Sequence, residues 1–275
     1  MNQIGFMQGR LSPQVDGKIQ AFPWQHWREE FPAAQKLGIR LMEWTLDHDR
    51  LAENPLMTSA GQAEIRVLSA QHGVRVGSLT GDIFMQMPFW RVTGAERAQR
   101  LAEFEQVAEA CATIGIRFIV VPLVDNGGMK TPEEESAVVE EFRLRAGWLQ
   151  QRGLAVVFEC DYPPAKLADF IARFPAGNFG VNYDIGNSAA LGYDSAQEIA
   201  AYFPRILNVH IKDRLLGGTT VPLGTGNANL PATLRDLSRR GYDGAYILQT
   251  ARAADGDHAG ALARYRDLAA GLITA

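Results

Sequence analysis

A junction of three parts recurs five times along the chain and limits the possible folds: an amphipathic stretch, a glycine and a short apolar run. The glycines are Gly38, Gly73, Gly115, Gly153 and Gly241. Glycine readily takes the left-handed conformation that follows the end of a helix. Each junction therefore predicts a helix that ends and a strand that begins directly after it.

The apolar runs are short, and several are continuous rather than alternating, which is typical of parallel strands covered on both faces. Strands are predicted at eight places, with helical segments between them and a last helix at 260–273: 4–7, 40–44, 75–79, 118–123, 155–160, 180–184, 206–211 and 245–249. Repeated strand–helix alternation predicts the α/β class and a single (β/α)8 TIM barrel as one domain over residues 1–275.

An open doubly wound sheet is the alternative to the barrel. Such a sheet usually carries a Gly-x-Gly-x-x-Gly loop after its first strand, where it binds a dinucleotide. The turn in this chain reads Gly-Phe-Met-Gln-Gly-Arg over residues 5–10, which is a different pattern. The length of 275 residues also suits a barrel, which typically needs about 250.

Composition narrows the classes of partner. The net charge of −4 gives no electrostatic reason to bind nucleic acid or an anionic membrane. Two cysteines make no disulfide framework. The first residues lack the basic and apolar regions of a signal peptide, and no apolar run reaches the length of a membrane span. We therefore expect a cytoplasmic protein with a small-molecule substrate, and a homo-oligomer is left open.

Polar residues close the last four predicted strands, at the barrel end where catalysis takes place in this fold. They are Glu159, Asp184, His210 and Gln249. Carboxylates and an imidazole that converge in this way predict a site for one divalent metal ion: Mn²⁺, Mg²⁺, Co²⁺ or Zn²⁺. Simpler interpretations exist for single residues, since Asp184 is also suited to cap the following helix.

These residues lie in segments that resemble the sugar-phosphate isomerase/epimerase branch of the xylose isomerase-like TIM-barrel superfamily. The resemblance covers essentially the whole chain and is most specific over residues 181–229. It is carried by the segments 183–187 with 191–193, 208–214, and 222–226 with Asn229, and by the opening 4–11. In that family four strand-end residues, Glu, Asp, His and Glu, bind one divalent cation.

The resemblance assigns the first three ligands to Glu159, Asp184 and His210, but the fourth position holds Gln249. In the ketose epimerases of the family the two glutamates are also the acid/base pair, acting through an enediolate. Gln249 can offer its amide oxygen to a metal or a sugar hydroxyl, but it cannot shuttle a proton. With Glu159 as the base, one-base isomerisation of a sugar or sugar phosphate is slightly favoured over two-base epimerisation.

Further residues are candidates for contact with the substrate. Lys212 is predicted to be catalytic by stabilising the developing oxyanion, oriented by Asp213. The alternative is an ion pair of Lys212 with Asp213 or another loop acid. Glu43 is a candidate to bind a substrate hydroxyl, and a structural ion pair is the alternative. Asn187, within the resembling segment, is also expected to bind substrate.

Two arginines and one apolar loop complete the candidates. Arg10 and Arg252 follow the first and last predicted strands and could hold a phosphate or carboxylate group. The segment 81–90 is unusually apolar for a surface connection, which predicts either a lid over the sugar or a contact between subunits.

Other functions remain open at this point. Gln249 motivates a barrel without catalysis that binds sugars or assembles with partners. A dehydratase or lyase acting on a polyol would use the same metal and the same base. The apurinic-site endonuclease branch of the superfamily is disfavoured, because its three-metal cluster needs many histidines and a basic DNA-binding face, whereas this chain has five histidines in all.

Overall fold

The glycines of the five junctions all have a left-handed backbone, with φ between 62° and 84°. In each case a helix ends one to two residues before the glycine, and a strand begins two to four residues after it. The computed structural model describes residues 3–274. Within that range the pattern of glycines predicted where helices end and strands begin.

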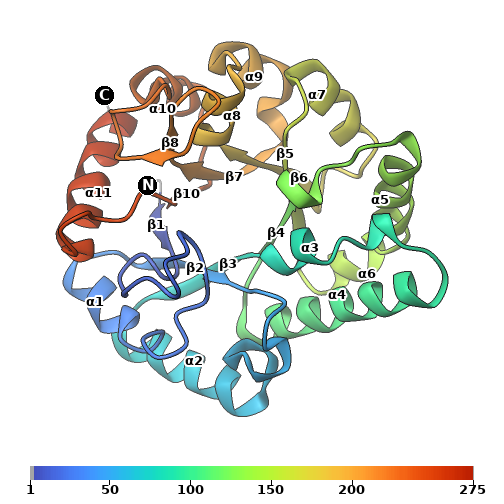
Figure 1. The fold of residues 1–275 in the computed structure, drawn as a ribbon, viewed down its shortest axis with the longest axis horizontal. Helices are drawn as coiled ribbons and strands as arrows, with labels where there is room; N and C mark the ends of the chain where they lie inside the picture. The colour runs from blue at the N-terminus through green and yellow to red at the C-terminus, as the bar shows by residue number, and fades with distance from the viewer. Residues whose placement is uncertain (1–2, 275) are drawn as a thin grey trace.

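Eight parallel strands close into a barrel, and Figure 1 shows the ring of helices around it. The predicted TIM barrel is confirmed, and no strand end differs from its prediction by more than one residue. The barrel strands are β1 Gln3–Met7, β2 Leu41–Thr45, β3 Arg75–Thr80, β4 Phe118–Leu123, β5 Ala155–Cys160, β6 Phe179–Asp184, β7 Ile206–Ile211 and β10 Ala245–Leu248. Their order around the barrel is β1-β10-β7-β6-β5-β4-β3-β2.

Helices connect the strands on the outside of the barrel. The α-helices are α1 Glu30–Lys36, α2 Ser59–His72, α3 Asp82–Gln86, α4 Gly94–Ile114, α5 Pro132–Leu144, α6 Ala146–Gln151, α7 Pro164–Ala172, α8 Ile185–Leu191, α9 Ser195–Tyr202, α10 Leu230–Arg239 and α11 His258–Thr274. Short 3₁₀ turns lie at Leu51–Glu53, Pro55–Met57, Phe89–Arg91, Asp125–Gly127 and Phe203–Arg205. Among the described residues, none of these helices combines the length and apolarity needed to cross a bilayer.

The barrel interior contains both apolar and polar side chains. A small apolar cluster of Met7, Leu41 and Ile247 fills part of it, separate from the main core between strands and helices. Polar side chains also occur inside, and Glu43 and Asn208 have no exposed surface. Buried polar groups are stable only when they are hydrogen-bonded. The sequence therefore places a polar network at the centre of the fold, where the site lies.

An antiparallel hairpin of β8 Asp213–Arg214 and β9 Thr220–Val221 follows β7 and was not predicted. The carboxylate of Asp213, the first residue of β8, accepts hydrogen bonds from three backbone N–H groups of the following loop. The donors are Gly224 and Gly226, at 2.9 Å each, and Ala228, at 3.0 Å. The prediction that Asp213 orients Lys212 is wrong, because Lys212 Nζ contacts Asp184 and Asn187 instead. Asp213 instead holds the glycine loop in place.

The apolar segment 81–90 forms α3 and the turn Phe89–Arg91. The Phe84 ring packs against Phe104 with centroids 5.4 Å apart, and the Phe89 ring packs against Phe142 at 5.5 Å. Both rings are buried in the described structure. The rings of Phe84 and Phe89 therefore pack in the core between the barrel and its helices, and these contacts support neither the predicted lid over the sugar nor the predicted contact between subunits.

Candidate metal centre

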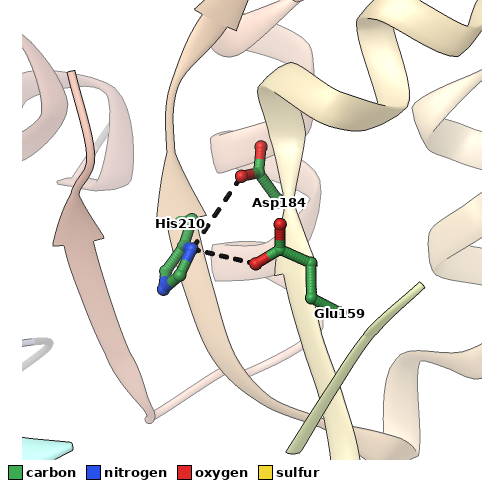
Figure 2. A group of neighbouring side chains, drawn as sticks. All are labelled: Glu159, Asp184 and His210. Atoms are coloured by element: carbon green, nitrogen blue, oxygen red, sulfur yellow. Dashed lines mark ion pairs between the residues drawn. The ribbon is translucent and has the colours of Figure 1, made fainter. Parts of the chain in front are cut away.

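Three of the predicted ligands converge at the carboxyl end of the barrel, as Figure 2 shows. Glu159 comes from β5, Asp184 ends β6, and His210 lies on β7. His210 Nδ1 lies 3.3 Å from Glu159 Oε2 and 3.8 Å from Asp184 Oδ2. One ligand atom from each residue lies within 4.8 Å of the others. Atoms bound at about 2.1 Å to one ion lie roughly 3–4 Å apart, so the cluster is close to the size that a cation requires.

Burial supports this interpretation of the cluster. The exposed fractions of Glu159, Asp184 and His210 are 7%, 3% and 0%. Carboxylates removed from water are costly unless positive charge or hydrogen bonds compensate them. Two oxygens and one nitrogen in this arrangement are a donor set that Mn²⁺, Co²⁺ or Zn²⁺ accepts. The residues present therefore fit a divalent metal ion.

Glu43 orients the histidine of the cluster. Its Oε1 lies 2.7 Å from His210 Nε2. Its Oε2 accepts hydrogen bonds from Ser78 Oγ at 2.7 Å and Asn208 Nδ2 at 3.0 Å. With no exposed surface and both oxygens bonded to protein groups, Glu43 takes the structural ion pair that was its alternative role, rather than an open position for a sugar hydroxyl. A carboxylate on one ring nitrogen turns the other nitrogen toward the metal position.

The charge state of His210 follows from these neighbours. Burial alone would lower the pKa of its imidazole, but the carboxylates of Glu43, Asp184 and Glu159 raise this pKa well above its ordinary value. In the metal-free protein the imidazolium balances part of the negative charge around it. A metal ion that binds Nδ1 must displace the proton from that nitrogen.

Two asparagines inside the barrel were missed by the sequence reasoning. Asn182 Nδ2 donates to Glu159 Oε2 at 2.8 Å and lies 3.1 Å from His210 Nδ1. Asn208 Nδ2 donates to Asn182 Oδ1 at 2.8 Å. The two-residue period of a strand contained the signal, because each asparagine precedes a cluster residue by two positions and so faces the same side.

Asp184 caps the following helix with one carboxylate oxygen and turns the other toward the cluster. Its Oδ1 accepts the backbone N–H of Asn187 at 2.8 Å, which caps α8. Its Oδ2 faces Lys212 Nζ at 3.2 Å and His210. Burial alone would raise the pKa of Asp184, but Lys212, His210 and the Asn187 N–H together lower it to about 2. Asp184 is therefore a permanent anion at neutral pH.

Asn187 links the predicted base to the predicted lysine. Its Nδ2 donates to Glu159 Oε1 at 2.6 Å. Its Oδ1 accepts from Lys212 Nζ at 3.1 Å and from Arg214 Nη1 at 2.8 Å. Lys212 thus pairs with Asp184 at the mouth of the barrel. A cavity of about 170 Å³, lined in part by Asn187, Arg214 and Asp161, adjoins this group.

Gln249 has an unusual environment for an amide. Its side chain is 7% exposed, and its Nε2 donates to Gln20 Oε1 at 2.9 Å. Its Oε1 is buried without a hydrogen-bond partner among the described residues. A buried acceptor without a partner costs about 1–3 kcal/mol, which a bound cation would offset. The orphaned oxygen is the observation that favours Gln249 as a fourth ligand.

The two predicted anion-binding arginines hold the loop after β1. Arg10 is 4% exposed and donates to the carbonyls of Thr250 at 2.9 Å and Ile19 at 3.0 Å. Arg252 Nη1 donates to the Ser12 carbonyl at 2.7 Å. Burial, together with the charge of Arg252, lowers the pKa of Arg10 to about 9. Their binding of a phosphate stays a prediction, and their contacts in the structure are with the backbone.

One acid at the mouth was not singled out from the sequence. Asp82 is the first residue of α3, is 8% exposed, and accepts a hydrogen bond from Gln20 Nε2 at 2.6 Å. Burial and the charge of Asp47 raise its pKa to about 7, and Glu159 and Lys212 also act on it. The signal was its position two residues after β3, which the apolar character of the surrounding segment obscured.

Comparison with known proteins finds one sequence relative and two solved structures with a similar fold. The chain is 26% identical over 255 residues to L-ribulose-5-phosphate 3-epimerase UlaE of Escherichia coli O1:K1 / APEC, covering 88% of each chain. The solved D-psicose 3-epimerase with D-fructose has a TM-score of 0.77 at 15% identity, over 99% of this chain and 100% of that one. The zinc-containing IOLI protein has a TM-score of 0.74 at 15% identity, over 99% and 98%.

The structural matches show that the fold is shared, since their sequence identities are low. A family profile described as xylose isomerase-like TIM barrel matches residues 31–268, which is most of the chain. The matched range contains the three converging ligands and the residues that hold them. The chain therefore belongs to the xylose isomerase-like TIM barrel family.

Proposed function

We propose that this protein is a metal-dependent sugar or sugar-phosphate isomerase/epimerase that works through an enediolate, with Glu159 as the base. The observation that carries the proposal is the convergence of Glu159, Asp184 and His210 on a common point at the barrel mouth. The relationship to an L-ribulose-5-phosphate 3-epimerase supports the substrate class. The chain's own residues suggest how the work is divided.

Glu159 is held for proton transfer by two amides. Asn182 donates to one of its oxygens and Asn187 to the other, which fixes the carboxylate without removing its capacity to accept a proton. Lys212 lies next to Asp184 and Asn187, where an ammonium stabilises negative charge developing on a substrate oxygen. Glu43 keeps His210 oriented, and Arg10, Arg252 and Asn187 are the proposed contacts for the remainder of the substrate.

The cation would be held by Glu159, Asp184 and His210, with the Gln249 amide oxygen as the fourth ligand. When bound, a divalent ion supplies Lewis-acid stabilisation of the enediolate charge. The buried, unpartnered Oε1 of Gln249 and the cluster of three ligand atoms support this set. The identity of the ion is a choice among Mn²⁺, Mg²⁺, Co²⁺ and Zn²⁺.

The test combines elemental analysis with proton exchange. The purified protein is incubated in D₂O with L-ribulose 5-phosphate, D-fructose or D-psicose, and NMR follows deuterium at the carbons beside the carbonyl. We expect a bound divalent metal and deuterium uptake in at least one ketose. Glu159→Gln is expected to abolish uptake while the fold is retained. Uptake that persists in this variant removes Glu159 as the base.

Gln249 supports a second candidate, a barrel that binds sugars without turning them over. Its neutral amide stands where the family resemblance implies an acidic ligand. Calorimetric binding of the same ketoses without deuterium uptake would favour this candidate. A polyol dehydratase or lyase would differ from both, because its product loses water and the NMR spectrum shows a new unsaturated or deoxy compound.

A further inference from the structure

We propose that Asp82 is the second acid/base residue of this site and returns a proton to the substrate from a direction that Glu159 does not serve. The inference rests on the enediolate function proposed above and deepens it, because it assigns two-base epimerisation to a barrel whose last strand ends in glutamine. It revises the preference for one-base isomerisation drawn from Gln249 alone.

The position of Asp82 is the first argument. It lies two residues after the end of β3, and β3 lies across the eight-stranded ring from β7, which carries His210. Figure 1 shows α3 close to the barrel strands, inside the ring of longer helices. Asp82, Glu159 and Lys212 all lie at carboxyl ends of barrel strands, at the ends of β3, β5 and β7, and the charges of Glu159 and Lys212 both act on the pKa of Asp82. In the ring only β4 lies between β5, which carries Glu159, and β3, which precedes Asp82, so the two carboxyl groups would approach a substrate above His210 from different directions.

The hydrogen bonds of Asp82 are the second argument. Gln20 bridges the mouth, because its Oε1 accepts from Gln249 Nε2 at 2.9 Å and its Nε2 donates to Asp82 Oδ2 at 2.6 Å. Arg10 also donates to Gln20 Oε1, at 3.4 Å, which fixes the orientation of the amide. The second oxygen, Oδ1, has no hydrogen-bond partner in the described part of the chain. Asp82 is therefore held by one oxygen and has the other available for a proton.

Its surroundings also favour proton exchange near neutral pH. Burial is the main cause that raises the pKa of Asp82 to about 7, and the charge of Asp47 adds to it. The Gln20 hydrogen bond and Lys212 act in the opposite direction, and Glu159 raises the pKa further. An acid whose pKa lies near the working pH is suited both to donate and to accept a proton. The amide of Gln249, which Gln20 links to Asp82, cannot donate and accept a proton in this way.

Glu159 and Asp82 together account for both proton transfers of an epimerisation. Glu159 removes the proton from the carbon beside the carbonyl; the C–H electron pair becomes the C=C bond of the enediolate, and the carbonyl oxygen takes the negative charge. The O–H bond of protonated Asp82 then breaks, its proton joins the same carbon from the other side, and the carbonyl is restored. Glu159 ends protonated and Asp82 ends as a carboxylate, and proton exchange with water resets both. No oxidant or reductant is required.

The experiment separates proton removal from inversion. Wild type, Asp82→Asn and the control Asp49→Asn are incubated in D₂O with L-ribulose 5-phosphate or D-fructose. Asp49 is an exposed acid of the neighbouring loop, and its variant controls for loss of one negative charge. NMR measures deuterium uptake in recovered ketose, and chromatography measures the epimer. In Asp82→Asn we expect uptake within about threefold of wild type and epimer formation reduced at least about 100-fold. Asp49→Asn should match wild type in both.

Two measurements that do not depend on turnover accompany the assay. Elemental analysis should find the same metal content in Asp82→Asn as in wild type, and the thermal midpoint should not fall, because Asp82 is no metal ligand and its amide retains an oxygen for Gln20. Loss of metal, or loss of uptake together with inversion, would show that Asp82 supports the site rather than returning the proton.

The remaining outcomes separate a failure of the Asp82 assignment from a failure of the proposed isomerase/epimerase function. Unchanged epimer formation by Asp82→Asn overturns the assignment of Asp82. Wild type that takes up deuterium without forming an epimer also overturns it, and leaves a one-base isomerase. Wild type that does neither with these ketoses overturns the proposed function and this inference with it.

Discussion

The Oε1 atom of Glu43 lies 2.7 Å from Nε2 of His210, and neither side chain has any exposed surface. The two residues are 167 positions apart in the chain. Because Nε2 is taken by Glu43, His210 presents Nδ1 to Glu159 and Asp184. This one ion pair decides which nitrogen of the imidazole is available to a metal ion.

Replacing Glu43 tests that relationship. Glu43→Gln keeps the shape of the side chain but removes the negative charge beside His210. We expect metal affinity to fall by about 10- to 100-fold, the usual effect of losing a partner of a ligating histidine. Titration against a fluorescent chelator measures the affinity. An affinity equal to that of wild type would mean that Glu43 has no part in preparing His210.

Removing the imidazole should remove the metal. His210→Ala is expected to lose nearly all bound metal in elemental analysis. The metal would keep two carboxylates and an amide as ligands but would lose its only nitrogen ligand. The variant also leaves Glu43 buried without its charged partner, which costs about 3–5 kcal/mol of unfolding free energy. His72→Ala is the matched control, since His72 is half-buried at the end of α2 and contacts Gln35 instead of the cluster in the barrel. Equal metal content in the two variants would remove His210 from the ligand set.

A carboxylate at position 249 should strengthen the metal site at a structural cost. Gln249→Glu supplies an anionic ligand in place of the unpartnered amide oxygen. We expect metal affinity to rise by about tenfold, or ~1.4 kcal/mol. In metal-free protein the thermal midpoint should fall, because Gln20 Oε1 then faces an oxygen instead of the donor Nε2. An affinity that stays constant would place position 249 outside the metal's coordination sphere.

Asp82 also predicts a pH dependence of stability. Its pKa in the folded protein is raised to about 7 from an ordinary 3.8. The folded state therefore keeps a proton that the unfolded chain loses, and the wild type should lose stability relative to Asp82→Asn as pH rises from about 4 to 7. Above that range the difference should level off. Urea unfolding of metal-free protein measures it, and a constant difference from pH 4 to 8 would contradict the raised pKa.

Much of this molecule follows from local rules that operate within a few residues. The left-handed glycines end helices, the continuous apolar runs form buried parallel strands, and both are properties of short segments. Once eight such units close into a barrel, all strand ends meet at one mouth. Glu159, Asp184 and His210 could therefore be brought together from their positions at strand ends alone.

The partners of those residues could not be derived in this way. Glu43 was equally suited to a sugar hydroxyl, and only the closure of the barrel brings it against His210. Asp213 stands next to Lys212 in sequence, where β7 ends and β8 begins, yet Asp213 binds the glycine loop while Lys212 contacts Asp184. Adjacent residues on a strand point to opposite faces, so sequence neighbours are poor guides to contact.

The sequence by itself determined the barrel and the residues at the ends of its strands, because helix ends and buried strands are decided by local backbone preference and apolar pattern. The tertiary structure alone decided that Gln20 joins Gln249 to Asp82, and which nitrogen of His210 is available. Those contacts join loops and strands that are far apart in sequence. Their geometry exists only after the ring has closed and water has been excluded from its mouth.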